Sequence, residues 1–291
     1  MGTGIALITP FDANGRIDLP ALTALIEHCV AGGVDFLVTL GTTGENVALS
    51  ETEQNEVVAH TLQINEGRLP IVLGLGGNNT NALVQKLKTL NTNGLAAILS
   101  VTPYYNRPSQ EGLFQHYSAL GAVSPLPIIL YNVPTRTGVN MTAATTLRLA
   151  HSNPIFAAVK EASGNINQAM EIIQHRPAHF AVLSGDDNLT LPMIACGGDG
   201  VISVVGQLYP REFSQMVGYA LAHELKNAQK LHYLLIHCTD LLFKEGNPAG
   251  VKAALAHLKI CGDTVRLPLL GASAELKKLI AAEMGKIETL K

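Results

Sequence analysis

The sequence predicts a closed (β/α)8 barrel followed by a tail of helices. Eight short apolar runs, rich in Val, Ile and Leu, recur along the chain, and their first residues lie 21 to 35 positions apart. This spacing leaves room for one strand, one helix and two loops per unit. Most runs do not alternate with polar residues, as expected for parallel strands buried on both faces. The predicted strands are Ile5–Thr9, Phe36–Leu40, Ile71–Leu75, Ala97–Val101, Ile128–Tyr131, Phe156–Lys160, Phe180–Ser184 and Val201–Val205.

Helix signals stand between the predicted strands. Asp18 followed by Pro20 predicts a helix start, and Ser50–Glu53 has the Ser-x-x-Glu form of a capping box. Leucines at i, i+4 and i+7 predict a helix over Thr80–Leu90, and Ser109 opens another. The chain therefore alternates strand and helix through all eight units.

The last part of the chain shows only helical patterns. Predicted helices cover Leu225–Phe243, Ala249–Leu258 and Ser273–Gly285, with no linker rich in Gly, Ser or Pro before them. We therefore divide the chain into a barrel over residues 1–224 and a helical region over 225–291. An open doubly wound sheet is the alternative, but the nucleotide-binding patterns GxGxxG after the first strand and GxxxxGKS/T are missing.

Composition excludes several classes of protein. With 20 basic and 23 acidic residues the net charge is −3, and no basic stripe predicts a nucleic-acid partner. Hydrophobic residues make up 47% and charged residues 15%, which excludes disorder and hints at self-association. No apolar run is long enough to predict a membrane span, and no basic leader precedes the first strand. The four cysteines are widely spaced, so we expect reduced thiols and a cytoplasmic protein.

Polar segments follow the predicted strands where a barrel of this kind places its active site. These segments are Gly41–Glu45, Thr102–Pro108, Tyr131–Gly138, Lys160–Gly164 and Ser184–Asp187.

Lys160 is the most informative single residue, because it ends an apolar strand. Lysine is rarely buried without a partner, so one interpretation is a structural ion pair across the barrel. The other is a Schiff-base lysine, since burial disfavours the charged form of an amine and a neutral amine can attack a carbonyl carbon. That chemistry needs no metal, because the protonated imine is itself the electron sink.

The neighbouring segments allow both ordinary and functional interpretations. The Gly41–Gly44 segment is either a common turn or a cradle in which backbone N–H groups and hydroxyls bind a small carboxylate. Tyr131 is either a buried tyrosine or a proton carrier near Lys160, and Arg136 is either solvated or a carboxylate clamp. Metal chemistry lacks support: no HExxH is present, and Asp186-Asp187 has no local His or Cys beside it.

Five strings in register resemble the class I pyruvate-dependent aldolase and N-acetylneuraminate lyase superfamily, and within it the dihydrodipicolinate synthase family. They are Gly41-Thr42-Thr43-Gly44-Glu45, Val101-Thr102-Pro103-Tyr104-Tyr105-Asn106, Leu130-Tyr131-Asn132-Val133-Pro134-Thr135-Arg136-Thr137-Gly138, Lys160-Glu161-Ala162-Ser163-Gly164-Asn165 and Ser184-Gly185-Asp186-Asp187. The resemblance covers essentially the whole chain. It implies a lyase that condenses pyruvate with L-aspartate 4-semialdehyde to 4-hydroxy-tetrahydrodipicolinate, in lysine and diaminopimelate biosynthesis. It implies no cofactor beyond a covalent imine with pyruvate.

The resemblance also implies residue roles. Lys160 would form the imine, Tyr131 would carry protons to and from it, and Thr42 would link Tyr131 to Tyr105 in a hydrogen-bonded relay. Thr43 would bind the pyruvate carboxylate. The remaining positions are Arg136 for the carboxylate of the second substrate, and Gly185 and Ile202 as pocket lining.

Two alternatives stay open on the sequence. N-acetylneuraminate lyases and aldolases of 2-keto-3-deoxy sugar acids keep the lysine and the tyrosine, but a polyhydroxylated substrate has little use for Arg136, and Thr43 also favours the synthase. A non-catalytic barrel that senses a ligand is the alternative from another class. Nothing essential to the chemistry is missing, which disfavours it.

The resemblance implies a homotetramer built as a dimer of tight dimers, with Tyr104 contributing across the tight interface. Many relatives bind lysine as an inhibitor in a cleft there, and Asn78 and Tyr104 match two of its positions. Ala82 stands where lysine-sensitive relatives carry a glutamate, and Glu51 and Gln54 where some have histidines. We therefore predict weak or absent lysine inhibition.

The segment Gly246-Asn247-Pro248-Ala249-Gly250 also departs from the Pro-Asn-Pro-Ile-Pro of other members. The sequence gives no functional account of this departure.

Overall fold

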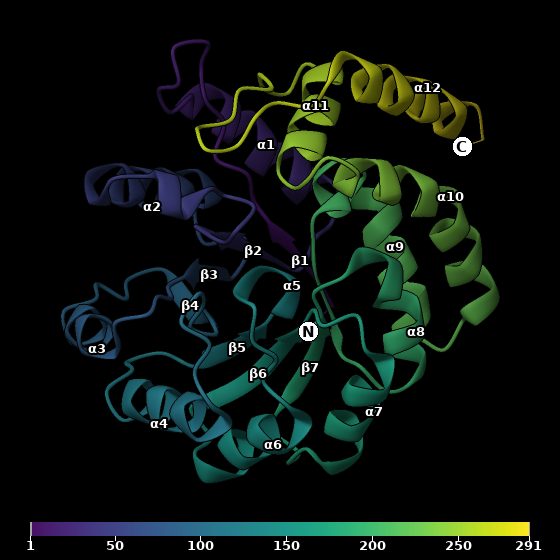
Figure 1. Cartoon of the computed structure of the whole chain (residues 1–291). Helices are drawn as coiled ribbons and strands as arrows, with labels where there is room; N and C mark the ends of the chain where they lie inside the picture. The colour runs from purple at the N-terminus through teal and green to yellow at the C-terminus, as the bar shows by residue number, and fades with distance from the viewer. Residues whose placement is uncertain (1, 291) are drawn as a thin grey trace.

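The computed structural model describes residues 2–290 and confirms the predicted barrel. Eight parallel strands close on themselves in sequence order, with β8 paired to β1, and the helices surround them (Figure 1). The strands are β1 (Gly2–Ala6), β2 (Phe36–Thr39), β3 (Ile71–Gly74), β4 (Leu95–Val101), β5 (Ile128–Asn132), β6 (Phe156–Glu161), β7 (Ala181–Ser184) and β8 (Gly200–Ser203).

Helices fill every connection between strands. In the barrel they are α1 (Leu19–Ala31), α2 (Glu51–Asn65), α3 (Thr80–Lys88), α4 (Gln110–Gly121), α5 (Pro134–Thr137), α6 (Ala143–Ser152), α7 (Ile166–His175), α8 (Thr190–Ala195) and α9 (Pro210–Leu221). Short 3-10 turns are η1 (Asn46–Ala48), η2 (Asp187–Leu189) and η3 (Val205–Gln207). The tail contains α10 (Leu225–Phe243), α11 (Ala249–His257) and α12 (Ala274–Leu290), so the third tail helix is longer than predicted.

The predicted helix starts are correct because their capping hydrogen bonds form. The Asp18 side chain accepts from the backbone N–H of Ala21, and Ser109 caps α4 in the same way. The Ser50–Glu53 capping box is complete, with both reciprocal hydrogen bonds present. Local side-chain chemistry therefore fixes these boundaries.

The first strand begins earlier than the sequence predicts. It covers Gly2–Ala6 instead of Ile5–Thr9, because residues 2–5 pair with residues 200–203 of β8. Gly4 also leaves space for the Phe36 ring, which would lie 2.2 Å from an added Cβ. Beyond the strand, the Ile8 N–H donates to the Gln207 side chain instead of a neighbouring strand. The apolar run at residues 5–9 therefore indicates which residues are buried, but it does not indicate which backbone groups pair with a neighbouring strand.

The last strand ends earlier than the sequence predicts. It ends at Ser203, because Val204 adopts a helical backbone and η3 follows. The Asp187 carboxylate accepts from the N–H groups of both Val204 and Val205, which turns the chain away from the sheet. Burial raises the pKa of Asp187 to about 6.

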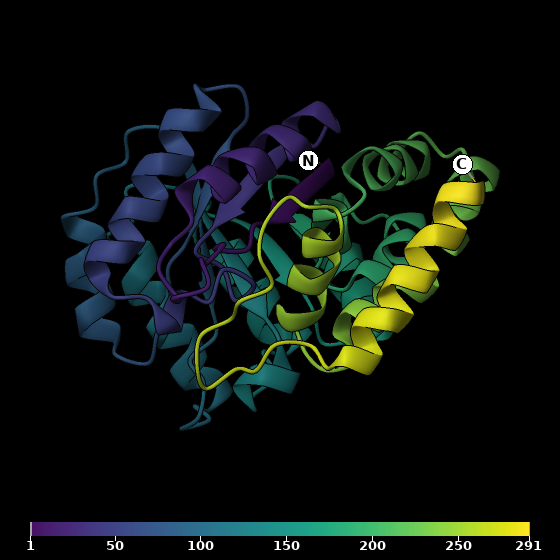
Figure 2. The same cartoon turned by 90° about the horizontal axis from the view of Figure 1, so that it is seen from above.

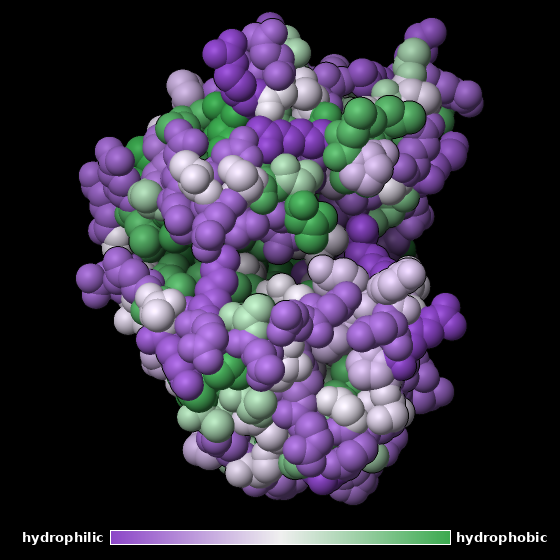
Figure 3. Space-filling model, turned by 60° about the vertical axis from the view of Figure 1, so that its left-hand side comes forward, coloured by the Kyte–Doolittle hydropathy of each residue, from purple (hydrophilic) through white to green (hydrophobic). Residues whose placement is uncertain are grey.

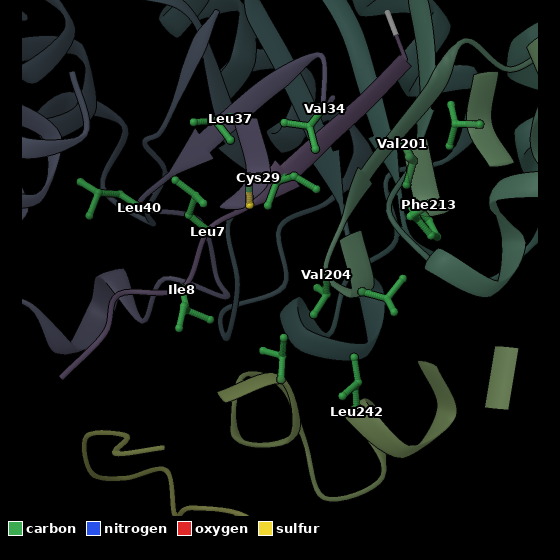
Figure 4. Close-up of a cluster of buried hydrophobic side chains, with 14 of the residues drawn as sticks. Leu7, Ile8, Cys29, Val34, Leu37, Leu40, Val201, Val204, Phe213 and Leu242 are labelled. Atoms are coloured by element: carbon green, nitrogen blue, oxygen red, sulfur yellow. The ribbon is translucent and has the colours of Figure 1, made fainter. Parts of the chain in front are cut away.

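The tail shares one core with the barrel. Figure 4 shows part of the buried apolar cluster, in which Leu242 of α10 joins Val204 and Leu7. The segment between α11 and α12 runs beside the N-terminal part of the chain (Figure 2). Within residues 2–290, none of the helices has both the length and the apolar character needed to cross a membrane.

The departure at residues 246–250 has a packing reason. Gly246 has φ 102°, in the region that favours glycine. A Cβ on Gly250 would lie 2.1 Å from the Leu242 carbonyl oxygen, so α10 and α11 approach closely only with glycine there.

Apolar side chains also reach the surface. Figure 3 shows several hydrophobic patches among the hydrophilic side chains of the face it presents. The most exposed large apolar residues of the described chain are Val47 at 81%, Tyr105 at 90%, Leu267 at 78% and Leu270 at 75%.

Candidate active site

A cavity of about 430 Å³ opens at the carboxyl ends of the barrel strands. Both the barrel loops and the tail line it, so the tail completes the site. Its polar lining residues are Thr42, Thr43, Tyr131, Thr135, Arg136, Lys160, Asp186, Asn188, Thr239, Asp240, Lys244 and Asn247.

Lys160 and Tyr131 lie side by side at the floor of this cavity. They are register partners on β6 and β5, and both point into the barrel. Lys160 is 5% exposed, and its Nζ lies 4.4 Å from the centre of the Tyr131 ring. No carboxylate forms a salt bridge with this amine in the described chain. The ion-pair interpretation of Lys160 is therefore disfavoured.

Gly185 leaves the space that the Lys160 side chain occupies. A Cβ at Gly185 would lie 3.0 Å from Cε and 3.1 Å from Cγ of Lys160, and 2.6 Å from the Ala162 Cβ. Gly185 therefore lines the cavity as predicted, and its missing side chain makes room for the Lys160 side chain.

The loop after β2 brings two hydroxyls to the cavity. Thr42 is half-buried and Thr43 is 3% exposed, and both line the cavity. The Asn247 amide donates to the Thr43 hydroxyl at 2.9 Å. Sequence reasoning noticed Asn247 only as part of a departure, because 204 residues separate it from Thr43.

Arg136 stands at the exposed side of the cavity, on the short helix α5. Its Nη2 donates to the Asn247 backbone carbonyl at 3.4 Å. No carboxylate among residues 2–290 forms a salt bridge with this guanidinium, so its positive charge is available to an anionic ligand.

A carboxylate network supports the strands behind these residues. Glu161 is 2% exposed and accepts from the Asn132 and Gln168 amides and from the Ser163 N–H. Asn132 in turn accepts from the Met141 N–H, which holds the far end of the loop carrying Arg136.

Two predicted site residues lie elsewhere. Tyr105 is 90% exposed and makes no hydrogen bond to Thr42 within the described chain, so the relay Tyr131–Thr42–Tyr105 does not form inside one copy. Ile202 lies beneath the cavity in the barrel interior cluster at 1% exposure, together with Tyr131. It supports the floor rather than lining the cavity.

The four candidate effector residues do not share one cavity in this chain. Glu51 and Gln54 line a groove between α2 and α3. Tyr104 lines a separate hollow beside Thr42, and its N–H donates to Asn78 Oδ1 at 2.8 Å.

The family of the chain follows from a comparison of its whole length. The family model described as the dihydrodipicolinate synthetase family matches residues 1–286. The chain belongs to this family. The finding confirms the resemblance carried by the five sequence strings.

Individual members of the dihydrodipicolinate synthetase family agree over nearly the full chain. A 4-hydroxy-tetrahydrodipicolinate synthase from Flavobacterium psychrophilum is 49% identical over 276 residues, covering 95% of this chain and 94% of its own. The crystal structure of dihydrodipicolinate synthase from Aquifex aeolicus superposes with a TM-score of 0.95 at 38% identity, covering 99% of this chain and 98% of that one. The enzyme from Acinetobacter baumannii, complexed with pyruvate, has a TM-score of 0.95 at 34% identity, covering 99% and 98%.

Proposed function

We propose that the chain condenses pyruvate with L-aspartate 4-semialdehyde to 4-hydroxy-tetrahydrodipicolinate, in lysine and diaminopimelate biosynthesis. The observation that carries the proposal is the buried Lys160 amine, unpaired with any carboxylate of the described chain and 4.4 Å from the Tyr131 ring centre. Membership of the dihydrodipicolinate synthetase family and the pyruvate complex of a solved relative support the same chemistry.

The reaction starts with attack of the Lys160 Nζ on the keto carbon of pyruvate, and water leaves as the imine forms. Removal of a methyl proton gives an enamine, which attacks the aldehyde carbon of the second substrate and forms the carbon–carbon bond. The amine of that substrate then attacks the imine carbon, closes the ring and releases Lys160. The protonated imine supplies the electron sink, so the proposed steps require no metal.

Thr43 and Arg136 give the cavity two places for carboxylates. The Thr43 hydroxyl, with backbone N–H groups of its loop, suits the carboxylate of pyruvate next to Lys160. The Arg136 guanidinium, at the exposed side of the cavity, suits the carboxylate of the second substrate. This charge favours the semialdehyde over the polyhydroxylated aldehydes of sugar-acid aldolases.

We propose that Tyr131 carries protons and that a second copy of the chain completes its relay. Tyrosine is a weak base at neutral pH and needs a hydroxyl partner to take a proton. Thr42 lies at the cavity, whereas Tyr105 stands away from its own chain at 90% exposure, as a side chain that serves a neighbouring copy would. The proposed assembly is therefore a tight dimer, paired into a tetramer.

Two further expectations accompany this proposal. We place the reaction in the cytoplasm, which is supported by the free state of all four cysteines. We expect lysine to inhibit weakly or not at all, because Ala82 supplies no carboxylate to the effector amine.

A comparison of aldehydes tests the substrate. Purified enzyme with pyruvate should turn over aspartate 4-semialdehyde in an assay coupled to the reductase that consumes the product. Arg136→Met should raise KM for the semialdehyde by about 100-fold, because a charged hydrogen-bonded pair is lost, and should leave pyruvate trapping by borohydride unchanged. Preference for N-acetylmannosamine over the semialdehyde would overturn the proposed substrate.

A further inference from the structure

A fully buried ion pair connects the helical tail to the loop after β2. Lys252 of α11 is completely buried, and its Nζ lies 2.5 Å from Oε1 of Glu45, whose side chain is 1% exposed. Lys252 also donates to the Thr264 carbonyl at 2.8 Å and lies 4.1 Å from the centre of the Phe11 ring. Taking two charges out of water has a high desolvation cost, so a buried ion pair is weak evidence for stability. Its role lies in the segments that it holds in place.

The second oxygen of Glu45 is bound by the tail as well. The Arg266 N–H donates to Glu45 Oε2 at 2.9 Å, and the Arg266 guanidinium donates to the carbonyls of Gly15 and Ala48. The segment between α11 and α12, which Figure 2 shows beside the N-terminal part of the chain, is thus fixed to this same loop. Both oxygens of one carboxylate hold tail residues.

The loop that ends at Glu45 has a backbone that its residues do not favour by themselves. Leu40 and Glu45 bracket it, with φ 54° and 53°, in the left-handed region. This backbone conformation is unfavourable for a non-glycine residue and persists where surrounding contacts determine it. Between the two lie Thr42 and Thr43, the hydroxyl residues of the cavity.

Two residues at the start of α11 make such contacts with the loop. Asn247, just before the helix, donates to the Thr43 hydroxyl, and Lys252, at the end of its first turn, holds Glu45. A rigid helix therefore fixes two points of the loop, on either side of Gly44. Loss of the buried pair would leave the Glu45 carboxylate held only through the Arg266 N–H.

We propose that Lys252 is a positioning residue for pyruvate, which acts through Glu45 to fix the Thr42 and Thr43 hydroxyls at the cavity. The inference rests on the proposed function, because that function assigns the pyruvate carboxylate to this loop. Lys252 itself does not touch substrate. Its loss is expected to raise the pyruvate concentration that the site needs, while the Lys160 amine keeps its ability to form the imine.

The test uses the full chain with Lys252→Met. Borohydride trapping is measured against pyruvate concentration, together with the melting temperature of the variant. The half-saturating pyruvate concentration is expected to rise about tenfold, a loss of about 1.4 kcal/mol, while the trapped fraction at saturation matches the wild type. An unchanged half-saturating concentration would overturn the proposal, even if the melting temperature falls.

Two further variants make the result specific. Lys277→Met removes an ion pair of the same tail, to Asp263 at 2.5 Å, whose side chains are 46% and 37% exposed, and should change half-saturation less than about twofold. An equal shift in Lys277→Met would also overturn the proposal. Glu45→Gln keeps an acceptor for the Arg266 N–H, and should shift half-saturation in the same direction if Lys252→Met does not fold. If Glu45→Gln then leaves the half-saturating pyruvate concentration unchanged, the positioning role of Lys252 is overturned. If the proposed function itself is wrong, the wild-type enzyme traps no pyruvate, so this outcome can be distinguished from a failure of the Lys252 proposal.

Discussion

At the residue scale, three contacts shape the cavity: Lys160 lies beside the Tyr131 ring, Asn247 donates to Thr43, and Gly185 leaves space for Lys160. Lys160 could be predicted because a lysine at the end of an apolar strand is unusual in itself. Asn247 could not, because its partner Thr43 is 204 residues away and an asparagine beside a proline has no chemical signature. Gly185 was placed by resemblance, and its physical reason, the space for Lys160, appears only in the structure.

Gly185 gives a residue-scale prediction. Gly185→Ala should lower kcat/KM for pyruvate by about 100-fold, because the new methyl group displaces the Lys160 side chain and small misplacements of a reacting group cost that much. Steady-state kinetics and borohydride trapping measure the effect. Gly218→Ala is the matched control, since a Cβ at Gly218 on α9 meets no atom within 4 Å, and it should keep wild-type kinetics. Normal pyruvate kinetics in Gly185→Ala would show that the space is not needed.

At the element scale, periodicity and capping predicted the order of strands and helices, while boundaries depended on contacts. Helix starts at Asp18 and Ser50 follow from side chains within three residues, so local sequence sufficed. The start of β1 depends on its pairing with β8, and the end of β8 depends on the Asp187 carboxylate. The local sequence does not indicate which distant residues will become partners.

The capping box of α2 gives a prediction about pH. Hydrogen bonds from the Arg266 guanidinium, and then from the Ser50 N–H, lower the pKa of Glu53 from 4.5 to about 2. Because the folded-state pKa is the lower one, the stabilisation is present above pH 4.5 and is lost as the pH falls toward 2.

Glu53→Gln removes this charge and keeps a residue that still suits a capping box. It should lower the free energy of unfolding at pH 7 by about 1 kcal/mol, because the Arg266 pair is partly exposed. Urea unfolding at pH 7 and pH 3 measures the difference, which should shrink at the lower pH. A difference that stays constant between the two would contradict the assignment.

At the scale of the whole molecule, the tail lines the cavity of the candidate active site together with the barrel loops. The sequence predicted its three helices but not their contribution, because Asn247 and Lys252 reach the β2 loop only through the packing of α10 and α11. If Tyr105, which is 90% exposed, completes the proposed relay of a neighbouring copy, a pair of chains is the unit of function. Both points concern contacts between distant segments, which residue patterns do not encode.

Mixing two inactive variants tests the shared site. Tyr105→Phe and Lys160→Met should each lose about 100-fold or more of the activity, one through the proton relay and the other through the imine. Refolded or exchanged mixtures should recover activity, because a mixed dimer contains one site with Lys160 from one copy and Tyr105 from the other. An affinity tag carried by one variant checks that mixed dimers form, because the untagged variant is then recovered with the tagged one. Mixed dimers without recovered activity would place Tyr105 outside the reaction.

The most direct test of the whole account is the identity of the residue that binds pyruvate. The enzyme is incubated with pyruvate, reduced with borohydride and digested, and the peptides are examined by mass spectrometry. We predict one reduced pyruvate per chain, on Lys160, and none in Lys160→Met, which should keep its fold. No adduct on the wild-type chain, or an adduct on another lysine such as Lys244 at the cavity edge, would contradict the account.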